Sequence, residues 1–151
     1  MRDTLYGGRR FRTLNISDKG VREVLAVEAD TSFRAERVLR VLDLVTGWRG
    51  QPQAIRLDNG PEFLADRGIA LRYIQPGQPN QNAFIERYNR TYRHEVLEAY
   101  VFESLDQVRE ISAPWMQSYN KERPHDALAR VPPATYRAQI TARSSPLEMF
   151  P

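Results

Sequence analysis

The chain contains no cysteine, only two histidines and no long hydrophobic run. The absence of cysteine excludes a disulfide framework, a cysteine-based zinc site and a thiol nucleophile, and we expect a reducing, cytoplasmic environment. No apolar stretch approaches the roughly 18 residues of a membrane-spanning helix, and Met1 is followed by Arg2 and Asp3 instead of an apolar signal segment. We therefore expect neither membrane insertion nor export. No serine is placed to form a triad with either histidine.

The residues that are present suit a globular protein. The 151 residues include 22 Lys and Arg against 19 Asp and Glu, a net charge of +3, and 41% of them are hydrophobic. This length and apolar content are enough for one compact α/β domain with its own core. The slight excess of positive charge permits an anionic partner but does not identify one.

The N-terminal part has the pattern of an antiparallel sheet. Asp3–Tyr6 and Arg9–Asp18 are predicted strands, joined by a tight turn at Gly7-Gly8, because glycine tolerates positive φ. Glu23–Asp30 is apolar enough to form a central strand. We predict three consecutive antiparallel strands.

Helical spacing of apolar residues follows the third strand. Ser32 is predicted to be the N-cap of a helix that ends at Gly47 or Gly50. Two short strands come next, over Pro52–Asp58 and Ile69–Ile74. Only ten residues connect these two strands, whereas a parallel crossover normally needs a dozen or more. The connection is therefore unusually short.

The C-terminal half is predicted to be mainly helical. One helix is expected over residues 82–97, and another over Leu105–Tyr119 with Ser104 as its N-cap. Pro124, Pro132, Pro133 and Pro146 lie beyond Asn120, so we expect the remaining chain to run irregularly over the surface.

Two acidic residues occupy positions suited to chemistry. Asp58 stands where a predicted strand ends, which is where open α/β sheets place ligand-binding groups. Glu86 lies on a helix flank shared with Asn82, Arg90 and Arg93, beside an apolar stripe of Ile85, Tyr88, Tyr92 and Val96. Carboxylate oxygens bind hard divalent cations, which can promote phosphoryl transfer. Alternatively, Asp58 caps a turn and Glu86 is a solvated acid paired with Arg90.

Basic side chains near these acids could bind a nucleic-acid backbone, since Lys and Arg supply affinity for phosphate without regard to sequence. An ordinary solvated surface would have the same composition. The predicted DNA-binding residues are Asn82, Arg87, Arg90, Arg93, Lys121 and Arg123, and Arg130 belongs to the same basic group.

Three segments together resemble one family. They are Leu-Asp-Asn-Gly-Pro-Glu-Phe at 57–63, Gln-Pro-Asn-Gln-Asn-Ala-Phe-Ile-Glu-Arg-Tyr-Asn-Arg at 78–90 and Tyr-Asn-Lys-Glu-Arg-Pro-His at 119–125. The chain from about Asp3 to Arg137 resembles the catalytic domain of DDE transposases of bacterial insertion sequences, the branch related to retroviral integrases. The resemblance implies an α/β, ribonuclease H-like mixed sheet flanked by helices.

The resemblance also implies a reaction and its residues. Asp58 matches the second catalytic acid of the family and Glu86 the third, so both become expected metal ligands for Mg²⁺ or Mn²⁺. In such enzymes the ions support cleavage at an element end and transfer of the freed 3′-hydroxyl to target DNA. We expect residues 1–137 to form a partial catalytic core and residues 138–151 an irregular tail.

The chain departs from the family in two ways. The first acid of the family belongs to a Met-Asp-Phe segment and by register falls two residues before Met1. Asp3 shares its strand face but lies four residues on, about 13 Å away. In addition, only 27 residues separate Asp58 from Glu86, fewer than in relatives, which carry a helix there. We therefore expect an incomplete first strand, a missing crossover helix and an inactive or crippled enzyme.

Three functions remain as hypotheses. The first is a transposase catalytic-domain fragment that acts on element ends and target DNA. The second is a non-catalytic DNA-binding or oligomerising remnant, and the third is a ribonuclease H-like nuclease. We expect a homo-oligomer and a separate or upstream DNA-recognition module, in the bacterial cytoplasm and associated with the nucleoid.

Overall fold

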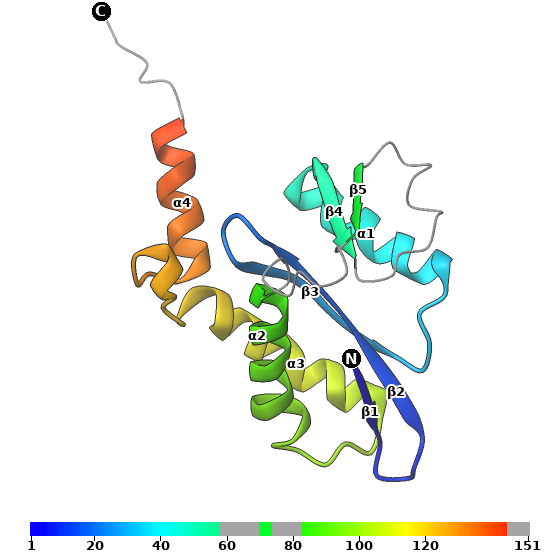
Figure 1. Cartoon of the computed structure of the whole chain (residues 1–151). Coiled ribbons are helices and arrows are strands. Elements are labelled where there is room, and N and C mark those ends of the chain that lie inside the picture. Colours follow the sequence, from blue (N-terminus) through cyan, green and yellow to red (C-terminus); the bar gives the residue numbers. More distant parts are fainter. Residues whose placement is uncertain (58–69, 74–82, 145–151) are drawn as a thin grey trace, which may run out of the picture.

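The computed structural model describes residues 1–57, 70–73 and 83–144 and has an α/β architecture (Figure 1). The elements follow in the order β1 (Arg2–Thr4), β2 (Arg10–Asp18), β3 (Glu23–Asp30), α1 (Ala35–Arg49), β4 (Ala54–Leu57), β5 (Ala70–Tyr73), α2 (Ala83–Tyr92), η3 (Arg93–Leu97), α3 (Leu105–Lys121), η4 (Asp126–Leu128) and α4 (Pro133–Ser144). The predicted order of three strands, a helix and two further strands is confirmed. None of the described helices is long and apolar enough to cross a membrane.

Strands β1, β2 and β3 form the predicted antiparallel sheet in that order. Gly8 turns the chain between β1 and β2 with φ +83°, a conformation that favours glycine. The pairing of Arg2 with Arg12 fixes the register of this hairpin. A bulge between Ile16 and Ser17 shifts the register of β2 against β3, and such bulges bend the strand and increase its twist.

Alternation along β3 assigns its two faces to different helices. Ala29 is buried in the core cluster that also contains residues of α2 and α3. Its neighbours Glu28 and Asp30 point to the other face, where the Arg37 guanidinium of α1 lies 3.1 Å and 3.7 Å from their carboxylates. A second ion pair, from Arg49 to Asp18 at 2.7 Å, ties the end of α1 to the sheet. Both faces of the sheet are thus covered.

The core between the sheet and helices α2 and α3 is built mainly from aromatic side chains. Tyr88, Tyr92 and Val96 are completely buried, as the apolar stripe on α2 predicts. The Tyr92 hydroxyl lies 2.6 Å from the Ser112 hydroxyl of α3, which satisfies a polar group in an apolar surrounding. Trp115 packs edge-on against Tyr92 with ring centroids 5.2 Å apart. These contacts fix the rotation of α2 and therefore the direction of its exposed face.

Helix α1 begins later than predicted. Its N-cap is Arg34, with no side-chain cap bond, and the exposed Ser32 lies two residues outside, so the expected Ser32 cap is wrong. Gly50 ends α1 with φ +92° and donates its backbone N–H to the Thr46 carbonyl. Of the two glycines predicted to end the helix, Gly47 lies inside it.

Strands β4 and β5 pair in parallel, with Ala54 opposite Ala70 and Leu57 opposite Tyr73. Within the described residues they form a two-stranded sheet of their own, whereas the prediction places all strands in one mixed sheet. The short β1, with only three residues, offers little edge for further pairing. The predicted loss of a crossover helix falls between β4 and β5 and lies outside the described residues.

The predicted helix over 82–97 consists of two parts. The α-helical part α2 ends at Tyr92, and a widened π-turn, η3, continues to Leu97. The wider turn places two consecutive side chains, Val96 and Leu97, in the core, which a regular α-helix does less readily. The following helix α3 begins as predicted, with the Ser104 hydroxyl accepting the Gln107 backbone N–H.

The C-terminal segment is more regular than predicted. Residues Pro133–Ser144 form helix α4, so the expected irregular tail is wrong for residues 138–144, and the predicted boundary at 137 falls inside a helix. Proline counts suggest irregularity, but Pro133 stands at the first helical position, where the missing N–H costs nothing and the fixed φ favours a helix. Residues 145–151 lie outside the described part of the chain.

Candidate functional site

Glu86 lies in the first turns of α2, and its side chain is exposed. The buried face formed by Tyr88 and Tyr92 holds α2 in place, so the Glu86 carboxylate points away from the core. Among the described residues it has no hydrogen-bond or ion-pair partner, and the alternative pairing with Arg90 is not observed.

One turn further along α2, a hydrogen bond joins the helix to the sheet. The Asn15 side-chain amide on β2 donates to the Asn89 Oδ1 at 2.7 Å. The same amide lies 3.4 Å from the Met1 sulfur. The exposed face of α2 near Glu86 is consequently held beside β2 and the residues that precede β1.

Asp3 on β1 is engaged elsewhere. Its carboxylate accepts the Thr4 backbone N–H at 2.7 Å and lies 3.6 Å from the Arg93 guanidinium. Arg93 also donates to the Arg2 carbonyl at 3.0 Å. Arg93 is predicted to bind DNA, and in the folded chain it also joins η3 to β1.

Two of the predicted site residues, Asp58 and Asn82, lie outside the described residues. Within residues 1–57, 70–73 and 83–144, no group of three or more His, Asp or Glu side chains converges in a way that could hold a metal ion. Glu86 is thus the one predicted ligand whose surroundings the structure describes.

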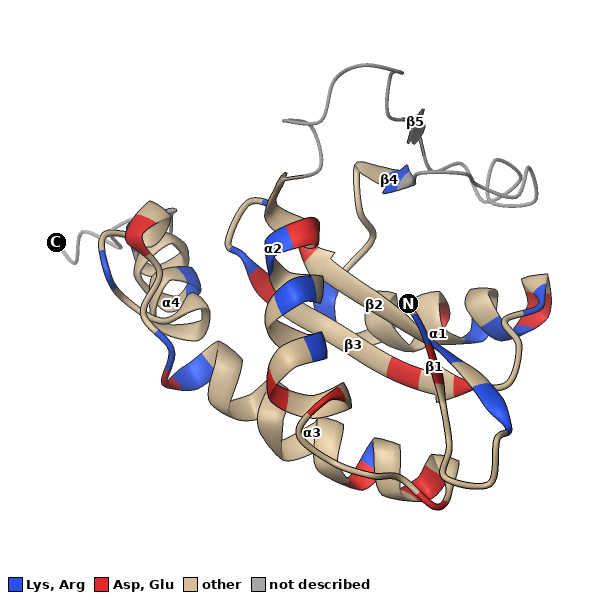
Figure 2. Cartoon of the chain, turned by 60° about the horizontal axis from the view of Figure 1, so that its bottom comes forward, with Lys and Arg blue, Asp and Glu red and all other residues tan. Residues whose placement is uncertain are grey.

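The predicted DNA-binding residues divide into exposed and engaged groups. Arg87, Arg90 and Lys121 are exposed, and Figure 2 shows basic positions along the ribbon of α2. Arg130 is also exposed but lies 3.6 Å from the Asp126 carboxylate. Arg87 and Arg90 follow Glu86 on α2, and neither has an ion-pair partner among the residues that the structure describes.

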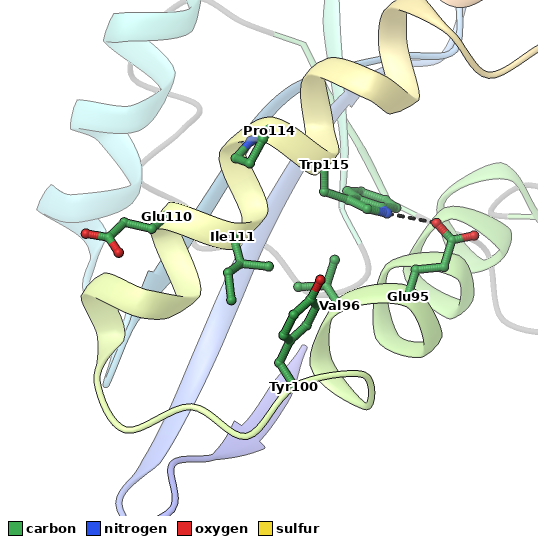
Figure 3. Close-up of a pocket in the computed structure, with 7 residues that line it drawn as sticks. All are labelled: Glu95, Val96, Tyr100, Glu110, Ile111, Pro114 and Trp115. Carbon is green, nitrogen blue, oxygen red and sulfur yellow. Dashed lines mark hydrogen bonds between the residues drawn. The ribbon is translucent and has the colours of Figure 1, made fainter.

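Arg123 makes contacts within the protein that stabilise the fold. Its guanidinium donates to both Glu95 oxygens, at 2.6 Å and 2.5 Å, and lies over the Tyr119 ring at 5.4 Å. The Trp115 indole N–H donates to the same carboxylate at 2.8 Å (Figure 3). These contacts link η3, α3 and the segment after α3, so Arg123 of the third sequence motif joins the elements that position α2.

A cavity of about 340 Å³ borders this cluster, between η3 and α3. Its walls combine apolar side chains with the carboxylates of Glu95 and Glu110 (Figure 3). Glu95 is nine residues beyond Glu86, about 13 Å along a helix axis, and its oxygens are already bonded to Arg123. The cavity is therefore not part of the predicted metal site.

The contacts of Glu95 predict a pH-dependent stability. Partial burial alone raises the pKa of Glu95, but hydrogen bonds from Arg123 and Trp115 outweigh it and hold that pKa below its ordinary value of 4.5. A lowered pKa in the folded state stabilises the protein above the unfolded pKa, and this contribution disappears as the pH falls through the folded pKa. We expect Glu95→Gln to destabilise the protein at pH 7 by less than about 1 kcal/mol.

Urea unfolding of the wild type and Glu95→Gln at neutral pH and near pH 3 measures this effect. The difference in free energy of unfolding should shrink at the lower pH. Glu110→Gln, at an exposed acid in the middle of α3, is the matched control and should change little at either pH. A difference for Glu95→Gln that stays constant with pH would contradict the assignment.

Sequence reasoning misses two residues that the structure brings to this region. Asn120, buried at the end of α3, bonds to both backbone polar groups of Val24 on β3 at 2.8 Å. Arg22, in the turn before β3, lies over the Phe84 ring of α2 at 4.7 Å. The sequence offers one local signal for Asn120, which is a polar residue on the buried side of a predicted helix. It offers no signal for the contact of Arg22, because that contact joins residues 62 positions apart.

The sheet and its flanking helices have the fold of solved integrase catalytic cores. A solved structure of the HTLV-2 integrase catalytic core domain, in complex with magnesium and in a trimeric form, has a TM-score of 0.66 at 15% identity, covering 90% of this chain and 90% of that chain. The BIV integrase catalytic core gives a TM-score of 0.63 at 18% identity, covering 96% and 95%. At these identities the likeness concerns the fold, which is ribonuclease H-like as predicted.

Residues 67–133 match the family described as integrase core domain. An insertion element IS476 uncharacterized 39.2 kDa protein of Xanthomonas euvesicatoria is 39% identical over 95% of this chain and 44% of its own length. An insertion element IS407 uncharacterized 31.7 kDa protein of Burkholderia multivorans is 37% identical over 93% of this chain and 53% of its own length. The chain is therefore similar to integrase-like DDE transposase catalytic domains, and it spans about half the length of these relatives.

Proposed function

We propose that this chain is the catalytic-core part of an insertion-element transposase, in which Glu86 is one ligand of a divalent metal ion and the arginines of α2 hold the DNA backbone. The main support is the exposed Glu86 carboxylate, without a protein partner among the described residues, on a helix whose opposite face is locked into the core. Asp58 is proposed as the second ligand, in keeping with its place directly after β4.

Of the proposed metal ligands, the structure describes the surroundings of Glu86 alone, and its exposed carboxylate suits a hard cation. A carboxylate with free oxygens is the ligand that Mg²⁺ and Mn²⁺ prefer. When bound, such ions activate the attacking oxygen and stabilise the leaving oxygen of a phosphoryl displacement. The protein itself would contribute Glu86 and Asp58 as ligands, and Arg87 and Arg90 as phosphate contacts that orient the DNA strand.

The strand register supports a proposal for where the first acid of the family would lie. Paired residues of β1 and β2 have numbers that sum to 14, as in Arg2 with Arg12 and Thr4 with Arg10. Met1 continues this pairing, because the Thr13 N–H donates to its carbonyl at 3.0 Å. A residue two positions before Met1 would stand opposite Asn15, whose amide contacts α2 one turn from Glu86. We infer that a carboxylate at that position would share a metal ion with Glu86 and Asp58.

A second function is favoured by the unpaired arginines. Arg87 and Arg90 are exposed, and no acid within the described residues neutralises them. A chain that keeps this surface without three carboxylates would bind DNA in a salt-sensitive manner and perform no chemistry. We propose DNA, a further copy of the chain and a separate recognition module as partners, in the bacterial cytoplasm.

A joining assay separates these functions. The wild type, Glu86→Gln and the control Glu36→Gln are incubated with a pre-cut DNA end, a target duplex and Mn²⁺. We expect weak joining by the wild type and by Glu36→Gln, and none by Glu86→Gln. Salt-sensitive binding that is equal in all three, without cleavage, would support the non-catalytic remnant. Cleavage of branched or hybrid duplexes without joining would instead indicate a nuclease.

A further inference from the structure

Arg22 has a left-handed backbone conformation, and its side chain lies over an aromatic ring. It lies in the turn between β2 and β3 with φ +59°, in the left-handed region that non-glycine residues rarely adopt, and such strain collects at functional sites. Its guanidinium lies 4.7 Å from the centre of the Phe84 ring on α2. The cation–π contact directs the charge of Arg22 to the N-terminal end of α2.

His125 lies in the same region, on the segment after α3. Its ring packs edge-on against Tyr119 with centroids 5.1 Å apart. The His125 Nε2 is buried and has no hydrogen-bond partner. In Figure 1 the β2–β3 turn, the start of α2 and the segment after α3 lie close together, and the hydrogen bonds between Val24 and Asn120 join two of these segments. Three parts of the chain meet at this point.

The charges around His125 are mostly positive. Burial lowers the pKa of His125, and the nearby guanidinium groups of Arg123, Arg22 and Arg87 lower it further, whereas Asp126 acts in the opposite direction. Arg123 is already paired with Glu95. Within the described residues neither Arg22 nor Arg87 has an acidic partner. The region thus holds two uncompensated guanidinium groups and one unpaired ring nitrogen.

An anion with several acceptor oxygens would satisfy all three groups. Phosphate oxygens accept from guanidinium groups in bidentate geometry, and a protonated imidazole offers one more donor. We propose that Arg22, Arg87 and His125 form a phosphate-binding subsite that holds a backbone phosphate of DNA next to Glu86. This subsite deepens the proposed function and rests on it as far as the DNA is concerned.

DNA binding tests the subsite with a matched control. Arg22→Gln is compared with Arg10→Gln, which removes the same charge from the opposite end of β2, about 26 Å away and beyond the screening length of about 8 Å at physiological salt. Binding of a short blunt-ended duplex is measured from about 50 to 200 mM salt. The logarithm of the binding constant falls linearly with the logarithm of the salt concentration, and we expect Arg22→Gln to reduce the size of this slope by about 0.9. Over the range tested, the loss of affinity with salt should then be about 3.5-fold smaller than for the wild type. Arg10→Gln should behave as the wild type.

A titration with inorganic phosphate separates the subsite from DNA binding as a whole. Binding of phosphate should raise the pKa of His125, followed by NMR of its ring protons, in the wild type and in Arg10→Gln but not in Arg22→Gln. If phosphate raises the pKa of His125 but the protein does not bind DNA, the anion site is supported and its assignment to a nucleic-acid backbone is overturned. DNA binding of Arg22→Gln identical to that of Arg10→Gln would overturn the subsite while leaving the proposed function intact. No phosphate response in the wild type would also overturn the subsite.

Discussion

Replacing Asn120 by alanine is expected to lower the free energy of unfolding by about 2–6 kcal/mol. The Asn120 Oδ1 accepts the Val24 N–H at 2.8 Å, and its Nδ2 donates to the Val24 carbonyl at 2.8 Å. Asn120 is only 7% exposed and Val24 only 1%, so water does not readily replace the lost bonds. Each buried backbone group left without a partner costs about 1–3 kcal/mol.

The place of Val24 at the edge of the sheet explains why Asn120, and not another strand, makes these hydrogen bonds. Within the described residues β3 is the last strand of its sheet, and the register against β2 shifts near Val24. The side chain of Asn120 thus takes the place of a further strand and joins α3 to β3. Loss of this link should also loosen the segment after α3 that carries Arg123 and His125.

Denaturant unfolding with circular dichroism measures the effect. Gln117→Ala, at an exposed position of the same helix, is the control and should stay within about 0.5 kcal/mol of the wild type. Asn120→Asp keeps the acceptor but loses the donor and buries a charge, so it should also be strongly destabilised. A free energy of unfolding for Asn120→Ala close to that of Gln117→Ala would show that the two bonds contribute little.

The sequence predicts the parts of the fold that depend on local periodicity. The burial of Tyr88 and Tyr92 is confirmed because helical spacing decides which side chains of α2 enter the core, and Val96 of η3 is buried as well. The limits of β3, Glu23–Asp30, agree with the prediction because an apolar run of this length between turn residues suits a buried strand.

Other features depend on partners far away in the sequence. The bond from Asn120 to Val24 spans 96 positions, and that from Arg123 to Glu95 spans 28. Periodicity carries no information on such pairs, so Arg123 is interpreted from the sequence as a DNA contact and is found with a structural partner. Asp58 is assigned from the end of a predicted strand and from the family resemblance, and Asn82 from the helix flank that it shares with Glu86. Both assignments remain predictions.

A chain extended by Met-Asp-Phe directly before Met1 is expected to bind Mn²⁺ at least about tenfold more tightly than the present chain, a gain of 1.4 kcal/mol or more. The hydrogen bonds of Met1 support this geometry. Its amino group donates to the Thr13 carbonyl at 2.7 Å, and its carbonyl accepts the Thr13 N–H at 3.0 Å. A continuing strand would keep both bonds, since a peptide N–H replaces the amino group, and would place the new aspartate opposite Asn15.

Isothermal titration of Mn²⁺ into four chains tests whether this carboxylate and Glu86 share one ion. The chains are the present one, the extended one, the extended one with asparagine in place of the new aspartate, and the extended one with Glu86→Gln. If both carboxylates bind the same ion, removing either should abolish most of the gain, because the attraction between a divalent cation and each carboxylate depends on close approach. A gain that persists with asparagine would mean that the added backbone stabilises β1 without supplying a ligand. A gain that survives Glu86→Gln would place the ion away from α2 and remove Glu86 from the metal site.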